Sequence, residues 1–151
     1  MISLPEMGRV LALDVGEVRT GVAVSDPMRM IASPRDTIAM AAPAANIEAV
    51  RRAVAETEAV CVVVGVPYDR EGKPGPQAEK VLAFVEQLRA ALDIPVETVD
   101  ERFTTAGAER SLRMAEVRGR KRRKVIDQVA AAEILRSFLD RLAAAKRAEE
   151  T

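Results

Sequence analysis

The stretch LALDVGEVRTGVAVSD, residues 11–26, decides the fold that this sequence predicts. Apolar residues alternate up to Asp14, the chain turns through Gly16, and the alternation then resumes. This pattern is typical of a β-hairpin with a carboxylate at its mouth. Strands are expected at residues 9–14, 19–25 and 33–39. The three strands together predict an antiparallel meander.

Beyond the meander, helical and strand patterns alternate. Apolar residues from Ile47 to Val54 follow helical spacing, and the apolar run from Ala59 to Val66 is typical of a strand covered on both faces. A helix begins at Pro76, a strand ends at Asp100, and two helices follow, separated by a basic run. The pattern predicts an α/β protein with a mixed five-stranded sheet, three antiparallel strands then two parallel, flanked by helices. This is a ribonuclease H-like layout, in which the first and fourth strands lie side by side.

Length and composition favour one compact domain. The chain has 151 residues, of which 48% are hydrophobic and 30% charged. We expect a single domain over 1–151, with a tail at 143–151 that frays. The sequence has no apolar run of membrane-spanning length, and the apolar region at its N-terminus is too short for a secretory signal. The expected location is the cytoplasm, with no membrane partner.

The absence of histidine narrows the chemistry. Without imidazole, the Ser-His-Asp and Cys-His arrangements are excluded and a catalytic zinc site is disfavoured. Cys61, the one cysteine, lies in an apolar run and is expected to be a small buried hydrophobe. Carboxylate oxygens instead favour hard cations, so Mg²⁺ or Mn²⁺ is the expected cofactor.

Three acids are the candidate catalytic and metal-binding residues: Asp14, Glu101 and Asp127. Asp14 and Glu101 lie at the ends of predicted strands that should meet at one crevice. Asp127 opens the last long helix and heads its apolar stripe. Each acid alone has a simpler interpretation: Asp14 as a turn residue, Glu101 as a surface ion pair with Arg102, and Asp127 as a helix cap. Their combination favours metal.

Positive charge is concentrated just before Asp127. The segment RGRKRRK, residues 118–124, holds six of the 23 basic residues and no acid. Its nucleic-acid-binding candidates are Arg120, Lys121, Arg122, Arg123 and Lys124. A solvated loop or a localisation-like patch is the alternative interpretation. Because the run ends close to an expected metal ligand, we favour contact with a nucleic acid.

Six further residues are candidates for contact with nucleic acid: Arg19, Arg102, Thr104, Thr105, Tyr68 and Lys73. The arginines would hold phosphates, although Arg19 is equally suited to stabilising the turn before it. The threonine hydroxyls would meet a phosphate at a helix N-terminus, where plain capping is the simpler role. Tyr68 would stack on a base, an interaction worth about 1–3 kcal/mol.

Four segments in order, LALDVGEVRTGVAVSD, VVVGVPYDREGKPGPQAEKV, DERFTT and KVIDQVAAAEIL, resemble the YqgF-type family of Holliday-junction-resolvase-like proteins and candidate pre-16S rRNA nucleases. The match spans nearly the whole chain. The resemblance implies a ribonuclease H-like fold and places an acidic metal-binding triad on Asp14, Glu101 and Asp127. Ala130 stands where the wider resolvase superfamily often has a second acid on the last helix.

The resemblance implies a metal-dependent nuclease, with 5′-end processing of pre-16S rRNA favoured and RNA preferred to DNA as substrate. Two-metal hydrolysis of a phosphodiester is the expected reaction. Junction resolution in DNA is an alternative and requires a symmetric dimer, so monomer and homodimer both stay open. A non-catalytic RNA-binding assembly factor is another alternative. An actin-like ATPase is disfavoured, because one lobe cannot enclose ATP.

Overall fold

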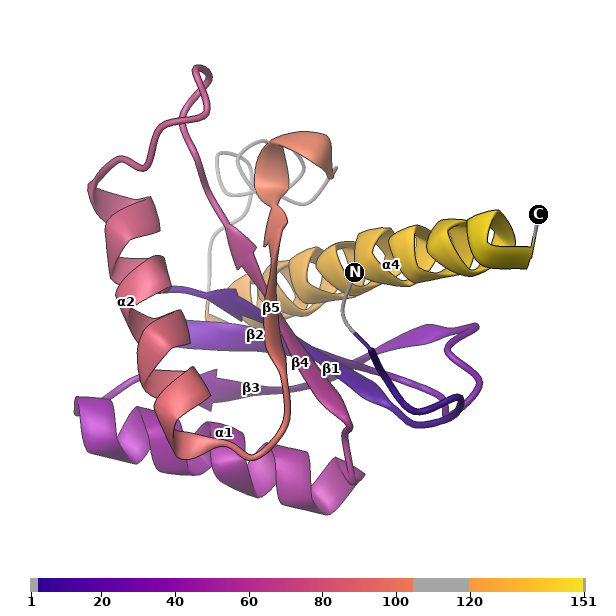
Figure 1. The fold of residues 1–151 in the computed structure, drawn as a ribbon. Helices are drawn as coiled ribbons and strands as arrows, with labels where there is room; N and C mark the ends of the chain where they lie inside the picture. Colours follow the sequence, from indigo (N-terminus) through magenta and orange to yellow (C-terminus); the bar gives the residue numbers. More distant parts are fainter. Residues whose placement is uncertain (1–2, 105–119, 151) are drawn as a thin grey trace.

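The computed structural model describes the backbone of residues 3–104 and 120–150, and the side chains of 3–104 and 126–150. Five strands form one sheet in the order β3-β2-β1-β4-β5 (Figure 1). The strands are β1 (Val10–Val15), β2 (Arg19–Ser25), β3 (Ala32–Ala39), β4 (Cys61–Val66) and β5 (Val96–Asp100). β1 pairs antiparallel with β2 and parallel with β4, and β5 is parallel to β4. The predicted mixed sheet and the β1–β4 adjacency are confirmed.

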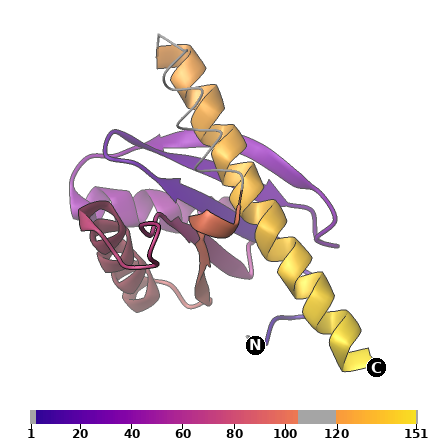
Figure 2. The same cartoon turned by 90° about the horizontal axis from the view of Figure 1, so that it is seen from above.

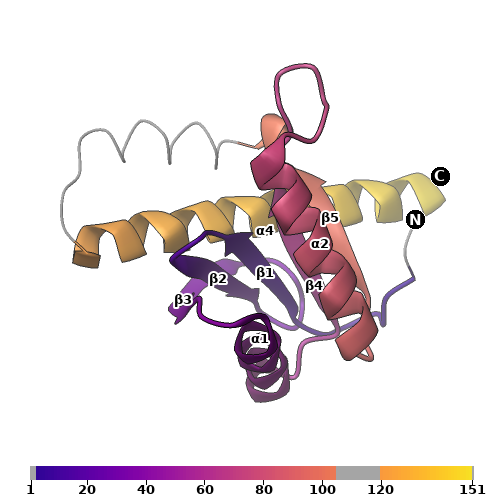
Figure 3. The same ribbon diagram turned by 90° about the vertical axis from the view of Figure 1, so that its left-hand side faces the viewer.

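Helices cover the two faces of the sheet. The structure contains α1 (Pro43–Thr57), α2 (Pro76–Ala91), the short 3-10 helix η1 (Glu101–Phe103) and α4 (Arg120–Glu150). Figure 3 shows α1 and α2 on one side of the sheet and α4 on the other. All six residues of β4 are buried, since this strand lies inside the sheet with helices over both faces.

The core has two parts, one on each face of the sheet. On the α1 and α2 face, leucine and valine side chains such as Leu13, Val64 and Leu88 pack together. On the α4 face the residues are smaller, and Ala12 and Ala23 of the sheet meet Ala131 of the helix. Small side chains on both surfaces let α4 lie close to the strands as it crosses the sheet (Figure 2).

The last helix begins earlier than the sequence pattern indicated. Asp127 was expected to open it, but α4 starts at Arg120, so Asp127 lies two turns inside. Arg and Lys are good helix formers, and nothing between Arg120 and Asp127 breaks a helix. The capping interpretation of Asp127 is therefore wrong. The helix also continues through residues 143–150, where a frayed tail was expected.

No helix within 3–104 or 120–150 is long and apolar enough to cross a membrane.

Cys61 provides a test of the core on the α4 face. Its side chain is fully buried, and burial, with the charge of Glu97, raises the pKa of the thiol to about 12. The folded protein should therefore resist an alkylating reagent at pH 8, whereas denatured protein should react at one thiol per chain. Because the unfolded thiol ionises near its ordinary pKa of 9.0, stability should fall as the pH rises from there towards 12. Rapid labelling of native protein would contradict this packing.

Candidate active site

Asp14 lies on β1 between two glycines of the neighbouring strands. It is the penultimate residue of β1 and is 2% exposed. By strand alternation its side chain shares the α4 face with Val10 and Ala12. Its antiparallel neighbour on β2 is Gly21. The parallel β1–β4 pairing ends at Leu13 and Val64, so the next residue of β4, Gly65, is the neighbour on the other side.

Gly21 lets α4 touch the sheet. A methyl group at Gly21 would overlap the carbonyl oxygen of Asp127 and lie 3.1 Å from the Asp127 Cβ. Only a residue without a side chain fits beneath the helix at this point. The contact brings Asp127, which is 5% exposed, next to the strand position paired with Asp14.

Gly65 makes room for Glu101 in the same way. Glu101 follows β5 as the first residue of η1, and its Oε1 would be 2.9 Å from a Cβ at Gly65. The Ile134 side chain of α4 also occupies this space. The Glu101 carboxylate therefore lies over Gly65 of β4, the strand next to the carboxyl end of β1 where Asp14 lies. The two glycine gaps bring all three predicted acids to one end of the sheet.

Asp127 is held by Arg19. The Nε of Arg19 donates to Oδ2 of Asp127 at 2.7 Å, and the two side chains are 14% and 7% exposed. Arg19 was predicted to hold phosphates or to stabilise its turn, and in the structure it forms this ion pair. A buried carboxylate requires such a partner, because an isolated charge in this environment is strongly unfavourable.

Oxygen donors of this kind suit a hard divalent cation. In the described parts of the chain, no three Asp, Glu, His or Cys side chains converge closely enough to hold one ion as they stand. One reason is that the Asp127 carboxylate is paired with the positive charge of Arg19. The donor set thus fits a metal once Asp127 exchanges its guanidinium partner for the ion.

Arg102 and Thr104 organise η1. Asp100 accepts hydrogen bonds from the backbone N–H of Arg102 at 3.0 Å and from its Nη2 at 2.7 Å, and these bonds lower the pKa of Asp100. The backbone N–H and the hydroxyl of Thr104 both donate to the Glu101 carbonyl oxygen at 3.2 Å. Both residues were predicted to contact nucleic acid, and in the structure both fix the turn that carries Glu101.

The other predicted binding residues are spread over the chain. Tyr68 packs against the core on the α1 and α2 face, while Lys73 is 75% exposed and lies 3.9 Å from Glu71. Thr105 lies outside the described residues. The basic residues 120–124 form the first turns of α4, and their side chains are likewise outside the described part.

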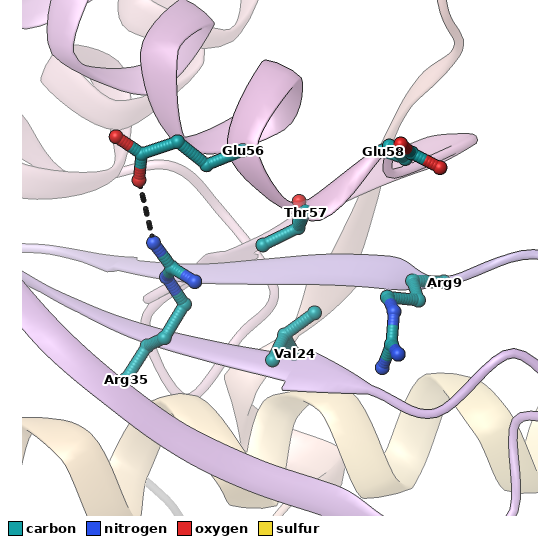
Figure 4. Close-up of a pocket in the computed structure, with 6 residues that line it drawn as sticks. All are labelled: Arg9, Val24, Arg35, Glu56, Thr57 and Glu58. Atoms are coloured by element: carbon teal, nitrogen blue, oxygen red, sulfur yellow. Dashed lines mark hydrogen bonds and ion pairs between the residues drawn. The ribbon is translucent and has the colours of Figure 1, made fainter.

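A hollow elsewhere shows no link to the acids. It encloses about 330 Å³ on the α1 side of the sheet, and α4 lies beyond the strands (Figure 4). Its lining residues are Arg9, Val24, Arg35, Glu56, Thr57 and Glu58. Arg35 and Glu56 pair across it at 2.7 Å. Its mixed charges favour neither a polyanion nor a cation, so the acidic end of the sheet is the candidate site.

The fold and this acidic sheet edge define an α/β protein of the ribonuclease H-like class. A solved Thermus thermophilus RuvC structure in complex with a Holliday junction substrate matches it with a TM-score of 0.55 and 14% identity, covering 90% of this chain and 96% of that one. At that identity the match supports the fold alone. It agrees with the layout predicted from the strand pattern.

The chain belongs to the RuvX family, described as Holliday junction resolvase, whose model matches residues 8–141. A Roseiflexus protein named "Putative pre-16S rRNA nuclease" is 46% identical over 135 residues, covering 89% of this chain and 96% of the relative. A Mycobacterium leprae protein of the same name is 43% identical over 149 residues, covering 97% and 81%. Family membership makes the chain a nuclease, a hydrolase of phosphodiester bonds. The family resemblance seen in the four motifs is confirmed.

The sequence pattern missed the two glycines and the Arg19–Asp127 pair. A glycine inside a strand is itself a signal of close approach by another segment, and both Gly21 and Gly65 are of this kind. The ion pair joins residues 108 positions apart, and no local pattern announces it.

Replacing Gly21 tests the helix contact. Gly21→Ala should force α4 away from β2, because a backbone carbonyl cannot yield as a flexible side chain does, and should lower the free energy of unfolding by about 1–3 kcal/mol or more. Urea unfolding measures this. The matched control is Gly75→Ala, where the added methyl meets nothing and φ is −78°. At position 75 alanine is a poorer N-cap than glycine, which destabilises the helix, but it also restricts the unfolded chain, which favours folding. The free energy of unfolding should therefore change by less than about 1 kcal/mol. Equal stability of the two variants would refute the close contact.

Replacing Arg19 tests the buried ion pair. Arg19→Gln leaves Asp127 without its cation and should destabilise the fold by about 3–5 kcal/mol. A fall in melting temperature of about 10 °C is the expected scale. Arg35→Gln is the matched control, since its pair with Glu56 is 36% and 53% exposed and should contribute less than about 1 kcal/mol. If both variants melt together, the Arg19 pair has no special role.

Proposed function

We propose that this chain is a metal-dependent nuclease that processes the 5′ end of pre-16S ribosomal RNA, with Asp14, Glu101 and Asp127 as its metal-binding and catalytic residues. The observation that supports the proposal is the close approach of Asp127 to Gly21 and of Glu101 to Gly65, the two strand positions on either side of Asp14. The RNA substrate is supported by the names of the relatives, which cover most of the chain. Ribosomal RNA processing in turn implies a cytoplasmic role.

Mg²⁺ or Mn²⁺ is the proposed cofactor. Asp14 lies on β1 between Gly21 and Gly65 and would contribute to the whole site, while Glu101 from η1 and Asp127 from α4 would complete it from either side. When bound, the cation polarises the phosphoryl oxygens and makes a water molecule more acidic for in-line attack.

Arg19 has a second task in this proposal. While the site holds no cation, its guanidinium compensates the buried charge of Asp127. If a cation replaced it as the partner of Asp127, Arg19 would be available to a phosphate oxygen at the same end of the sheet. Arginine suits this exchange because its planar donors match carboxylate and phosphate alike. The ion pair and the phosphate contact predicted from the sequence are then two states of one side chain.

A cleavage assay tests the proposal. Asp14→Asn should lower the rate of cutting of an RNA that carries the 5′ leader of the 16S precursor by more than about 100-fold, a larger loss than residues outside the ligand shell usually cause. The matched control is Asp93→Asn, an exposed acid before β5 at the other end of the sheet, which should cut like wild type. Melting with and without Mn²⁺ should show a metal-dependent rise that Asp14→Asn loses.

The same assay separates the alternatives. A four-way DNA junction and single-stranded DNA are cut in parallel, because the family description names junction resolution. Preference for the junction, with a dimer in solution, would replace RNA processing by resolution. RNA bound without cutting at any metal concentration would leave the non-catalytic assembly factor and overturn the nuclease.

A further inference from the structure

Phe103 is the aromatic residue that does not pack into the core. The chain has four aromatic side chains, all in the described part. Phe84 and Phe138 are buried in the two halves of the core, and Tyr68 packs against the half on the α1 and α2 face. Phe103 is 76% exposed. Its ring therefore gives up the stabilisation that burial would provide, although single exposed apolar residues are common and exposure alone proves nothing.

The exposed Phe103 side chain lies close in sequence to a candidate metal ligand. It ends η1, two residues after Glu101, whose carboxylate lies over Gly65 beside the Asp14 strand. Figure 1 shows this turn beyond the end of β5, on the same side as the loop that follows β4. Phe103 thus lies at the end of the turn that carries Glu101, next to the candidate active site. A nucleic acid whose phosphate reached the acids would bring a neighbouring base to it.

The ring is also held in place. Asp100 fixes Arg102 on one side, and Thr104 fixes the Glu101 carbonyl on the other, so the backbone around Phe103 is tied at both ends. The Arg102 guanidinium lies over the ring, with Cζ 5.0 Å from its centroid. This cation–π contact covers one face of the ring and leaves the other for a ligand. A fixed ring loses little conformational freedom on binding.

We propose that Phe103, backed by Arg102, is a stacking platform for an unpaired base next to the phosphate that is cut. The inference rests on the proposed function, since it places the ring relative to that phosphate. Bases within a duplex already stack on both faces, so a single exposed ring can hold only a base that is free of its neighbours. The substrate class is therefore RNA that is single-stranded at the cleavage point.

Fluorescence provides a direct test, because the chain contains no tryptophan. Phe103→Trp introduces a single reporter, and Asp14→Asn is added so that the RNA is not cut. Single-stranded oligoadenylate should quench the fluorescence in a saturable way, whereas duplex RNA of the same length should quench it weakly. The control reporter is Met30→Trp, at a position 79% exposed in the turn between β2 and β3, at the opposite end of the sheet, where no quenching is expected.

Affinity supplies the second measurement. In the same Asp14→Asn background, Phe103→Leu should bind oligoadenylate about 5- to 100-fold more weakly, and Phe103→Tyr should retain binding. Equal quenching by duplex and single strand, or unchanged affinity of the leucine variant, would overturn the stacking role. Neither readout needs catalysis. Quenching at Phe103→Trp with no cutting by the wild type would keep the platform and refute the nuclease, so the two proposals fail separately.

Discussion

The contact between the Asp127 backbone and Gly21 sets the distance between α4 and the sheet. A helix that lies on a strand with no side chain between them needs small residues along the rest of its path, and the α4 face of the core supplies them in Ala12, Ala23 and Ala131. The distance between helix and sheet then determines the position of the Asp127 carboxylate. Asp127 lies against the strand position that pairs with Asp14 because the helix is close, so packing of the core and assembly of the site depend on the same constraint.

The close contact has an electrostatic consequence. Asp14 and Asp127 are both nearly buried, in a region where two negative charges repel strongly. Arg19 compensates Asp127 at 2.7 Å, and its side chain is itself mostly buried. A site of this kind is less stable than an apolar one would be. The fully buried β4 and the larger core on the other face hold the sheet together independently of it, so the acids can be kept for chemistry.

Much of this arrangement was predictable from the sequence, for identifiable reasons. Alternation fixed the strands, and strand order followed because a buried parallel strand must sit inside the sheet beside β1. The ends of those strands placed Asp14 and Glu101 at one edge. The start of α4 was missed because the basic run was expected to separate two helices, although Arg and Lys favour helix. The Arg19–Asp127 pair and the exposure of Phe103 depend on tertiary contacts, which periodicity does not encode.

The early start of α4 changes how a substrate would lie. With the basic run in the helix, Lys124 precedes Asp127 by about 4.5 Å along the axis and Arg120 by about 10 Å. The backbone of the basic run therefore leads along the helix axis to Asp127, so a strand that followed this helix would arrive at the acids. Phe103 lies two residues beyond Glu101, at the end of η1. A strand held by its phosphates along one helix and by a base at η1 would cross the acids between two fixed points, and that placement favours in-line attack more than affinity alone.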